Sequence, residues 1–177
     1  MIALPNYADI NGRPMKKLQI QQYLRKLQLN DFEPAVNLAT LTKLQDAHLK
    51  YIPYENFDCL NGKITSLKRQ DMFNKVIMHN RGGICFELNG LYNWLLESLG
   101  FEVTSYSARF IDKMETYQLR RHRVMCVALG DKRYLTDVGV NSESPRVPLE
   151  ITEGLIQSDG ISQYKFTRSE FWGWLLW

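Results

Sequence analysis

Residues 81–87 have the sequence Arg-Gly-Gly-Ile-Cys-Phe-Glu and place Cys85 at the predicted start of an amphipathic helix. Apolar residues recur after it at spacings of three and four, and Gly100 stands where such a helix commonly ends. The paired glycines let the backbone enter the helix at an angle that a residue with a side chain resists. Unpaired amides and the dipole at a helix N-terminus favour negative charge on sulfur. Cys85 is therefore a candidate thiolate nucleophile.

A base for this thiol is available in His122, one of three histidines in the chain. Two strand-like segments follow it and are joined by Gly-Asp at residues 130–131. If these two residues form the turn, Leu129 pairs with Lys132, and Asp137 becomes the diagonal neighbour of His122 on one face of the sheet. A turn shifted by one residue would keep the two on one face but four residues apart, and a three-residue loop would place them on opposite faces. The predicted contact between His122 and Asp137 therefore depends on this turn.

A cysteine, a histidine and a carboxylate that contact one another in this order form the activated nucleophile used for acyl transfer. In that chemistry Cys85 attacks, His122 holds and returns the proton, and Asp137 orients the imidazole. Backbone amides beside the cysteine stabilise the oxyanion. Taken singly, free cysteines are more often small buried residues, and the histidine and the aspartate could each have a purely structural role. Their combination carries the prediction.

At this point the chain resembles the arylamine N-acetyltransferase family. Residues 81–87 match the family's Arg-Gly-Gly-x-Cys-Phe/Leu-Glu/Gln segment, residues 134–139 its Tyr-Leu-x-Asp-Val-Gly segment, and residues 52–56 its Ile-Pro-Phe/Tyr-Glu-Asn segment. His122 matches the family's strand histidine, and the four matches follow the family's order between residues 52 and 139. The resemblance as a whole covers nearly all of the chain. The resemblance implies that Cys85 takes an acetyl group from acetyl-coenzyme A and passes it to an arylamine or hydrazine in a ping-pong reaction.

The chain departs from the family's pattern at two places. Val140 and Asn141 follow Gly139 where the family has Phe-Gly, and because that loop helps to shape the acceptor pocket, the acceptor preference stays open. The sequence stops at Trp177, whereas family members continue into a third α/β domain that closes over the cleft and helps to bind coenzyme A. The chain thus resembles a C-terminally truncated member, in which we expect the triad to be present and turnover with arylamines to be weak or lost.

Two other functions agree with the same residues. One is a non-catalytic paralogue that keeps the fold and binds coenzyme A or a full-length partner. The other is a hydrolase with the same triad, because an open cleft lets water reach an acyl-enzyme that a closing domain would shield. Thioester hydrolysis in the absence of an amine acceptor would favour the hydrolase.

The composition of the chain limits the other classes of protein to which it could belong. With 177 residues, of which 45% are hydrophobic, the chain can form a real core in one large domain or two small ones. The 22 basic and 19 acidic residues give a net charge of +3, which is too balanced to indicate a nucleic-acid binder. Three cysteines without regular spacing favour neither a disulfide framework nor a zinc site. Since no signal-peptide pattern and no apolar run of bilayer length is present, we expect a reduced, cytoplasmic protein that binds neither metal nor membrane.

The first half of the chain predicts helices and the second half predicts strands, with a boundary near Gly100. We expect a helical bundle over residues 1–99 that carries the nucleophile helix, and an antiparallel, β-barrel-like domain over residues 100–177 that carries the hairpin. Ser66 is the expected N-cap of the helix that precedes Cys85. This is an α+β fold, and the resemblance adds a cysteine-protease-like core without the family's third α/β domain.

Cysteines and histidines outside the triad receive structural interpretations. Cys59 and Cys126 are predicted to lie in the core. His48 has helical spacing from neighbouring leucines and is predicted to pack with its hydrogen bonds satisfied. His79 is predicted to lie at a helix C-terminus, where a cation suits the dipole.

Arg81 and Glu55 are interpreted as a buried ion pair rather than as substrate contacts. A guanidinium fork that binds this carboxylate would fix the angle at which Cys85 leaves the loop. We therefore expect Glu55→Ala to lower stability before it lowers any activity, and equal melting temperatures with lost activity would contradict that interpretation.

The last seven residues, Phe-Trp-Gly-Trp-Leu-Leu-Trp, contain four aromatic side chains and no charge. Such a segment is either buried against the sheet or exposed as a site of self-association. Size-exclusion chromatography with and without these residues would distinguish the two.

Overall fold

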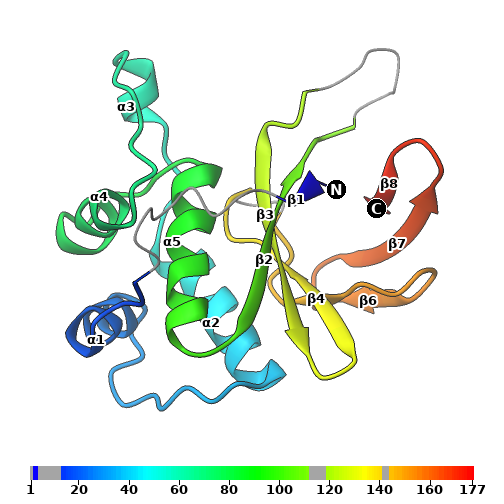
Figure 1. Cartoon of the computed structure of the whole chain (residues 1–177), viewed down its shortest axis with the longest axis horizontal. Coiled ribbons are helices and arrows are strands. Elements are labelled where there is room, and N and C mark those ends of the chain that lie inside the picture. Colours follow the sequence, from blue (N-terminus) through cyan, green and yellow to red (C-terminus); the bar gives the residue numbers. More distant parts are fainter. Residues whose placement is uncertain (1, 4–12, 112–118, 141–143) are drawn as a thin grey trace.

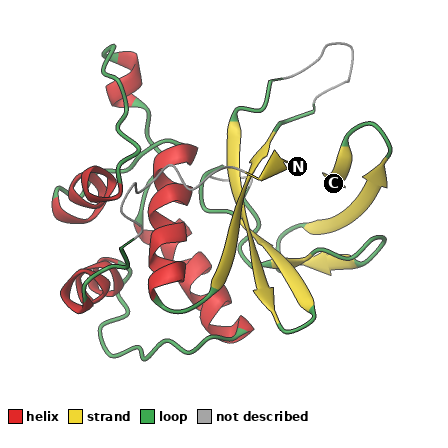
Figure 2. Cartoon of the chain, in the orientation of Figure 1, coloured by secondary structure: helices red, strands yellow, loops and turns green. Residues whose placement is uncertain are grey.

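The structure is a computed structural model that describes residues 2–3, 13–111, 119–140 and 144–177. Helices occupy one side of the molecule and strands the other, with helix α5 next to the larger sheet (Figure 1, Figure 2). The helical segments of the described residues are α1 (Lys17–Lys26), α2 (Leu38–Tyr51), α3 (Phe57–Leu60), α4 (Arg69–Phe73), the π-helical turn η1 (Asn74–Met78) and α5 (Cys85–Ser98).

The strands of the described residues form two antiparallel sheets. The larger sheet has the strand order β1-β2-β3-β4-β5, and the smaller has the order β6-β7-β8. The bounds are β1 (Ile2–Ala3), β2 (Glu102–Ala108), β3 (His122–Leu129), β4 (Lys132–Thr136), β5 (Leu149–Glu150), β6 (Ile156–Ser158), β7 (Gln163–Ser169) and β8 (Gly173–Leu176).

The expected barrel does not form, because neither sheet closes on itself within the described residues. A barrel needs every strand to be hydrogen-bonded on both edges. Strands β1 and β5 lie at the two edges of the larger sheet and contribute two residues each, so that sheet stays open. Only one isolated bridge outside the strands, between Glu153 and Phe166, is found beyond β5 in the part of the chain that is described. The prediction of an α+β fold with antiparallel strands is confirmed, and that of a barrel-like closure is wrong. The division at residue 100 and the cysteine-protease-like core stay predictions.

Helix α5 supplies the centre of the molecule. Most of its residues are buried, and it packs against β2 and β3 on one side and α4 on the other. Burying one leucine side chain contributes about 1.5–3 kcal/mol to stability, so a helix that buries several is fixed in place. The main apolar cluster joins this helix to α1, α2 and β3 through Leu88, Leu91, Tyr92, Leu95, Leu96, Tyr23, Leu27, Leu41, Leu44, Met125 and Val127. The N-terminus of α5 is therefore held by the core.

Two turns are formed by the glycines that the sequence analysis predicted for them. Gly100 has φ +92° directly after the C-cap of α5, a left-handed conformation that glycine adopts without strain. Gly130 has φ +60° in the two-residue turn at 130–131, and Leu129 pairs with Lys132. The predicted register of this hairpin is confirmed.

The helix before the nucleophile begins later than the sequence suggested. Lys68 is the N-cap of α4, and Ser66 instead donates from its Oγ to Asp71 Oδ2 at 2.6 Å, so the predicted N-cap is wrong. A short polar side chain can satisfy a nearby carboxylate as readily as a backbone amide. The helix continues into the π-helical turn η1, whose C-cap is His79, as predicted.

The two cysteines outside the triad differ in burial. Cys126 lies buried in β3, as expected, whereas Cys59 is exposed in α3. Helix α3 is a four-residue segment without buried side chains, and its short length leaves Cys59 outside the core. The prediction of a core position for Cys59 is wrong.

His48 is completely buried between two tyrosine rings. Its ring centroid lies 6.0 Å from that of Tyr23 and 5.4 Å from that of Tyr92. Within the described residues, neither of its ring nitrogens has a hydrogen-bond partner. Burial lowers the pKa of His48 to about 3, since an unpaired imidazolium is costly in an apolar environment. The predicted packing is confirmed, but the predicted hydrogen bonds are absent.

The aromatic tail is partly paired and partly exposed. Strand β8 pairs with β7, and Trp174 packs edge-on against Phe166 at a centroid distance of 6.2 Å. Phe171 and Trp177 are 76% and 63% exposed. The tail thus combines features of both alternatives, and self-association through it stays a prediction. No helix of the described residues has the length and apolar character needed to cross a bilayer.

Candidate active site

Cys85 is the first residue of α5, and the preceding glycines are needed for space. A Cβ atom at Gly82 would lie 1.9 Å from the backbone oxygen of Pro53, and one at Gly83 would lie 2.8 Å from Glu87 Oε2. Neither glycine has a positive φ, so the backbone angle inferred from the sequence is not what requires them. Close approach of the segment at residue 53 is the reason for glycine at position 82, and close approach of the Glu87 side chain is the reason at position 83.

His122 and Asp137 lie together, as the hairpin register predicted. His122 begins β3, and Asp137 directly follows β4, one position beyond the last paired residues. The distance from His122 Nε2 to Asp137 Oδ2 is 2.6 Å, and both side chains are almost completely buried. A buried contact of this kind fixes the orientation of the imidazole and leaves Nδ1 for the thiol.

The second oxygen of Asp137 is also occupied. Oδ1 accepts hydrogen bonds from Asn89 Nδ2 and from the backbone amide of Gly139, both at 2.8 Å. A carboxylate that accepts several bonds from fixed donors cannot rotate away from the histidine. Gly139 is also required by space, since a Cβ there would lie 2.8 Å from the Cα of Cys85.

Asn89 is a site residue that sequence reasoning missed. It lies on α5 four residues after Cys85, is fully buried, and donates to the backbone oxygen of Arg123 as well as to Asp137. Its Oδ1 accepts from the amide of Val138 at 2.9 Å. The signal available in the sequence was a polar amide on the apolar face of the helix, one turn beyond the thiol.

The thiol of Cys85 lies against the histidine and the segment before it. Its sulfur is 3.7 Å from the backbone oxygen of Arg121, and the thiol is close enough to His122 to contribute to the raised pKa of that imidazole. Burial would lower the pKa of His122, but the hydrogen bonds to Asp137 and to Cys85 outweigh it and raise the pKa to about 9. A histidine that stays protonated at neutral pH beside a thiol can return a proton in acyl transfer.

A cleft of about 870 Å³ opens beside His122 and Asp137. Its walls come from the end of β2, from β3 and from the hairpin of β7 and β8. The ring of Phe110 lies 5.2 Å from that of His122, between centroids. Val140, where the family has phenylalanine, also lines the cleft, whereas Asn141 lies outside the described residues. The aromatic part of the lining consists of Phe110, Phe166, Phe171, Trp172, Trp174 and Trp177.

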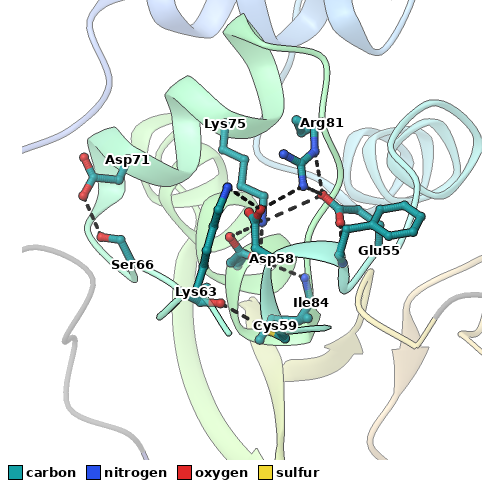
Figure 3. A network of polar contacts seen from close by, with 12 residues as sticks. Glu55, Asp58, Cys59, Lys63, Ser66, Asp71, Lys75, Arg81 and Ile84 are labelled. Atoms are coloured by element: carbon teal, nitrogen blue, oxygen red, sulfur yellow. Dashed lines mark hydrogen bonds and ion pairs between the residues drawn. The ribbon is translucent and has the colours of Figure 1, made fainter. Parts of the chain in front are cut away.

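A network of charged side chains lies close to Ile84, the N-cap of α5 (Figure 3). Arg81 Nη2 is 2.7 Å from Glu55 Oε1 and 3.3 Å from Asp58 Oδ1. The predicted pair of Arg81 and Glu55 is thus present, but Arg81 is 39% exposed, so the pair is only partly buried. The hydrogen bond from Lys75, the nearby Arg81 and their charges lower the pKa of Asp58 to about 2. Within the described residues, no group of three or more histidine, cysteine or acidic side chains is arranged to hold a metal ion.

Comparison with known proteins decides the family. A family model described as N-acetyltransferase matches residues 37–176. The arylamine N-acetyltransferase of Mycolicibacterium smegmatis is 36% identical over 152 residues, a match that covers 82% of this chain and 55% of the relative. The chain belongs to the arylamine N-acetyltransferase family.

Other members of the arylamine N-acetyltransferase family agree in sequence and in fold. The arylamine N-acetyltransferase of Escherichia coli is 33% identical over 132 residues, covering 74% of this chain and 47% of the relative. The solved structure of the Salmonella typhimurium protein has a TM-score of 0.83 at 26% identity and covers 92% of this chain and 63% of that one. The Mycobacterium smegmatis structure has a TM-score of 0.80 at 35% identity, covering 85% and 57%. The chain spans about half the length of the curated relatives it matches.

Proposed function

We propose that this chain carries out acetyl transfer from acetyl-coenzyme A to an arylamine or hydrazine, with Cys85 as nucleophile, His122 as proton carrier and Asp137 as the group that orients His122. The observation that carries this proposal is the buried contact of His122 Nε2 with Asp137 Oδ2 at 2.6 Å, next to the Cys85 thiol, whose sulfur lies 3.7 Å from the backbone oxygen of Arg121. Family membership supports the same chemistry.

The first half of the reaction acetylates the thiol. The Cys85 thiolate attacks the thioester carbonyl, a new carbon–sulfur bond forms, and the coenzyme A thiolate leaves with the proton that His122 held. The amides of Cys85 and Phe86 begin α5 and have no acceptor within the helix, so they are donors for the oxyanion.

The second half returns the enzyme to its starting state. The amine attacks the acetyl carbonyl on Cys85, His122 takes the proton released by the amine nitrogen, and the thiolate leaves. The cleft beside His122 supplies flat aromatic walls, which suit a planar acceptor through stacking. Val140 narrows these walls less than the family's phenylalanine would, and this difference favours wider acceptors.

Hydrolysis of the acetyl-enzyme is the second candidate function. The observation that favours it is the exposure of the cleft wall, since Phe171 and Trp177 both line the cleft and are 76% and 63% exposed. Water that reaches the acetyl thioester would compete with the amine. The same triad serves both reactions, and the acceptor decides the product.

Chromatographic analysis of acetyl-coenzyme A consumption, with and without 4-anisidine, separates these functions. Acetyl-anisidine formed in proportion to free coenzyme A supports the proposed transfer, and Cys85→Ala is the control that should form none. Consumption at the same rate without the amine would identify a hydrolase instead. A folded wild-type chain that consumes no acetyl-coenzyme A under either condition would contradict both and favour the non-catalytic paralogue.

A further inference from the structure

Lys75 is surrounded by three carboxylates near the N-terminus of α5. Its Nζ lies 2.8 and 3.1 Å from the two oxygens of Glu87, 2.9 Å from Asp58 Oδ2 and 3.9 Å from Glu55 Oε1. The lysine comes from η1, whereas its partners come from α5, α3 and the segment before α3, and Figure 3 shows Lys75 and Arg81 directed at the same acidic groups. One ammonium group thus joins three separate elements.

Glu87 connects this cluster to the nucleophile. Its Oε2 accepts the backbone amide of Ile84 at 3.0 Å, and its own amide donates to the Ile84 oxygen at 2.9 Å. This reciprocal arrangement holds the residue that directly precedes Cys85 in its extended N-cap conformation. The Glu87 side chain is 3% exposed, so its carboxylate is held in one place.

A fixed carboxylate at this point has an electrostatic cost for the site. A nearby negative charge disfavours a second one, so Glu87 alone would oppose ionisation of Cys85 two residues away. Lys75 contacts both oxygens of that carboxylate and offsets its charge. The desolvation of Lys75 would lower its pKa, but hydrogen bonds to Glu87 and Asp58 outweigh this and raise the pKa, so the ammonium stays charged at neutral pH.

We propose that Lys75 is a positioning residue of this site, which acts through Glu87 to hold the Ile84 amide and to cancel the carboxylate charge that would otherwise oppose the Cys85 thiolate. This inference rests on Cys85 as the nucleophile of the proposed function.

Apart from Cys59, which is replaced in every variant of the test, the other ionisable groups around Lys75, Glu87 and Cys85 remain unchanged. His122, itself bound to Asp137, contacts Cys85 from β3, and Tyr54 lies close enough for burial and the two thiols Cys85 and Cys59 to raise its pKa. Glu55 and Asp58 face Lys75, and Arg81 binds both.

The pH profile of Cys85 alkylation by iodoacetamide tests this inference without any acetyl donor. The reaction is read at the Cys85 peptide by mass spectrometry in a Cys59→Ser background, because Cys59 is exposed. We expect Lys75→Met to raise the midpoint of the profile by about 1 pH unit and Glu87→Gln to lower it, with the double variant near the starting protein and Lys75→Arg close to it as well. Lys50→Met removes an exposed lysine that is paired with Asp46, and this control should leave the midpoint in place.

A purely structural role for Lys75 would lower the melting temperature without moving the midpoint. Equal midpoints in Lys75→Met, Glu87→Gln and the starting protein therefore overturn the inference. If Lys75→Met does not fold, Glu87→Gln alone decides, with a lower midpoint in support and an unchanged one against. Because alkylation needs no acetyl-coenzyme A, failure of acetyl transfer and failure of this inference are distinguishable.

Discussion

His48 and His122 are both buried, at 0% and 4% relative exposure, yet they lie in opposite chemical surroundings. His48 packs between two tyrosine rings without a hydrogen-bond partner in the described residues, and burial lowers its pKa to about 3. For His122, burial acts in the same direction, but a carboxylate and a thiol outweigh it and raise the pKa to about 9. The hydrogen-bond partners of a buried histidine, and not its burial alone, therefore decide whether it can carry protons in a reaction.

Removal of the carboxylate should have the largest effect. Asp137→Asn keeps the size of the side chain but removes the charge that holds the His122 proton, so the rate of Cys85 acetylation should fall by about 10⁴-fold, as in other nucleophile triads. A time course by intact mass spectrometry measures this rate, and Asp131→Asn in the exposed turn is the matched control. A loss smaller than about tenfold would show that the carboxylate is not part of the machinery.

The raised pKa of His122 should make the protein less stable at alkaline pH. The folded state holds the proton up to about pH 9, whereas the unfolded state releases it near pH 6.5, so the stabilisation is complete below pH 6.5 and is lost as the pH rises through 9. The loss is at most about 3 kcal/mol. Urea unfolding between pH 6 and pH 9.5 measures it in the wild type, and Cys85→Ala, which removes one of the groups that raise the pKa of His122, should reduce it. The effect should disappear when His122→Gln is added, and a persistent loss would assign it to another group.

The lowered pKa of His48 should act at the other end of the pH range. The unfolded state takes up a proton near pH 6.5 and the folded state only near pH 3, so stability is lost as the pH falls between these values. Between pH 7 and pH 5 the loss should be about 2 kcal/mol. His48→Phe should remove most of this dependence and keep the ring packing, while the exposed His79→Gln should leave it unchanged. Equal acid profiles in His48→Phe and the wild type would contradict the comparison.

The smallest expected effect concerns the hydroxyl group beside His48. The Tyr23 hydroxyl is buried without a hydrogen-bond partner in the described residues, and a buried unpaired group of this kind costs about 1 kcal/mol or more. Tyr23→Phe should therefore raise the free energy of unfolding by about 1 kcal/mol in urea titrations. A clear loss of stability would mean that this hydroxyl and His48 share a bound water, and the contrast between the two histidines would then be smaller.

The position of Cys85 and the contact between His122 and Asp137 could be predicted from the sequence because each has a local signal. Apolar spacing located α5 and its N-terminal Cys85, and a Gly-Asp turn fixed the register that brings His122 to Asp137. The turn at residue 130 has little freedom, since its glycine adopts a positive φ that few other residues tolerate.

The supporting residues could not be predicted because their partners are distant in the sequence. Asn89 binds Asp137 across 48 positions, and Lys75 reaches Glu87 from a π-helical turn whose geometry has no simple periodic signal. The open sheets were missed for a similar reason, since strand patterns show which segments are strands but not whether the outermost strands pair. Local sequence patterns thus predicted the segments that carry the proposed catalytic residues, but not the long-range contacts that support them.

Intact-protein mass spectrometry after brief mixing with acetyl-coenzyme A tests most directly whether Cys85 is the nucleophile. Wild-type protein should gain the mass of one acetyl group, located on the peptide that contains Cys85, and Cys85→Ala should gain none. The adduct should also be absent from His122→Ala, which keeps the thiol but lacks its proton carrier. A folded wild-type protein that stays unmodified, or an adduct that persists in Cys85→Ala, would contradict the account.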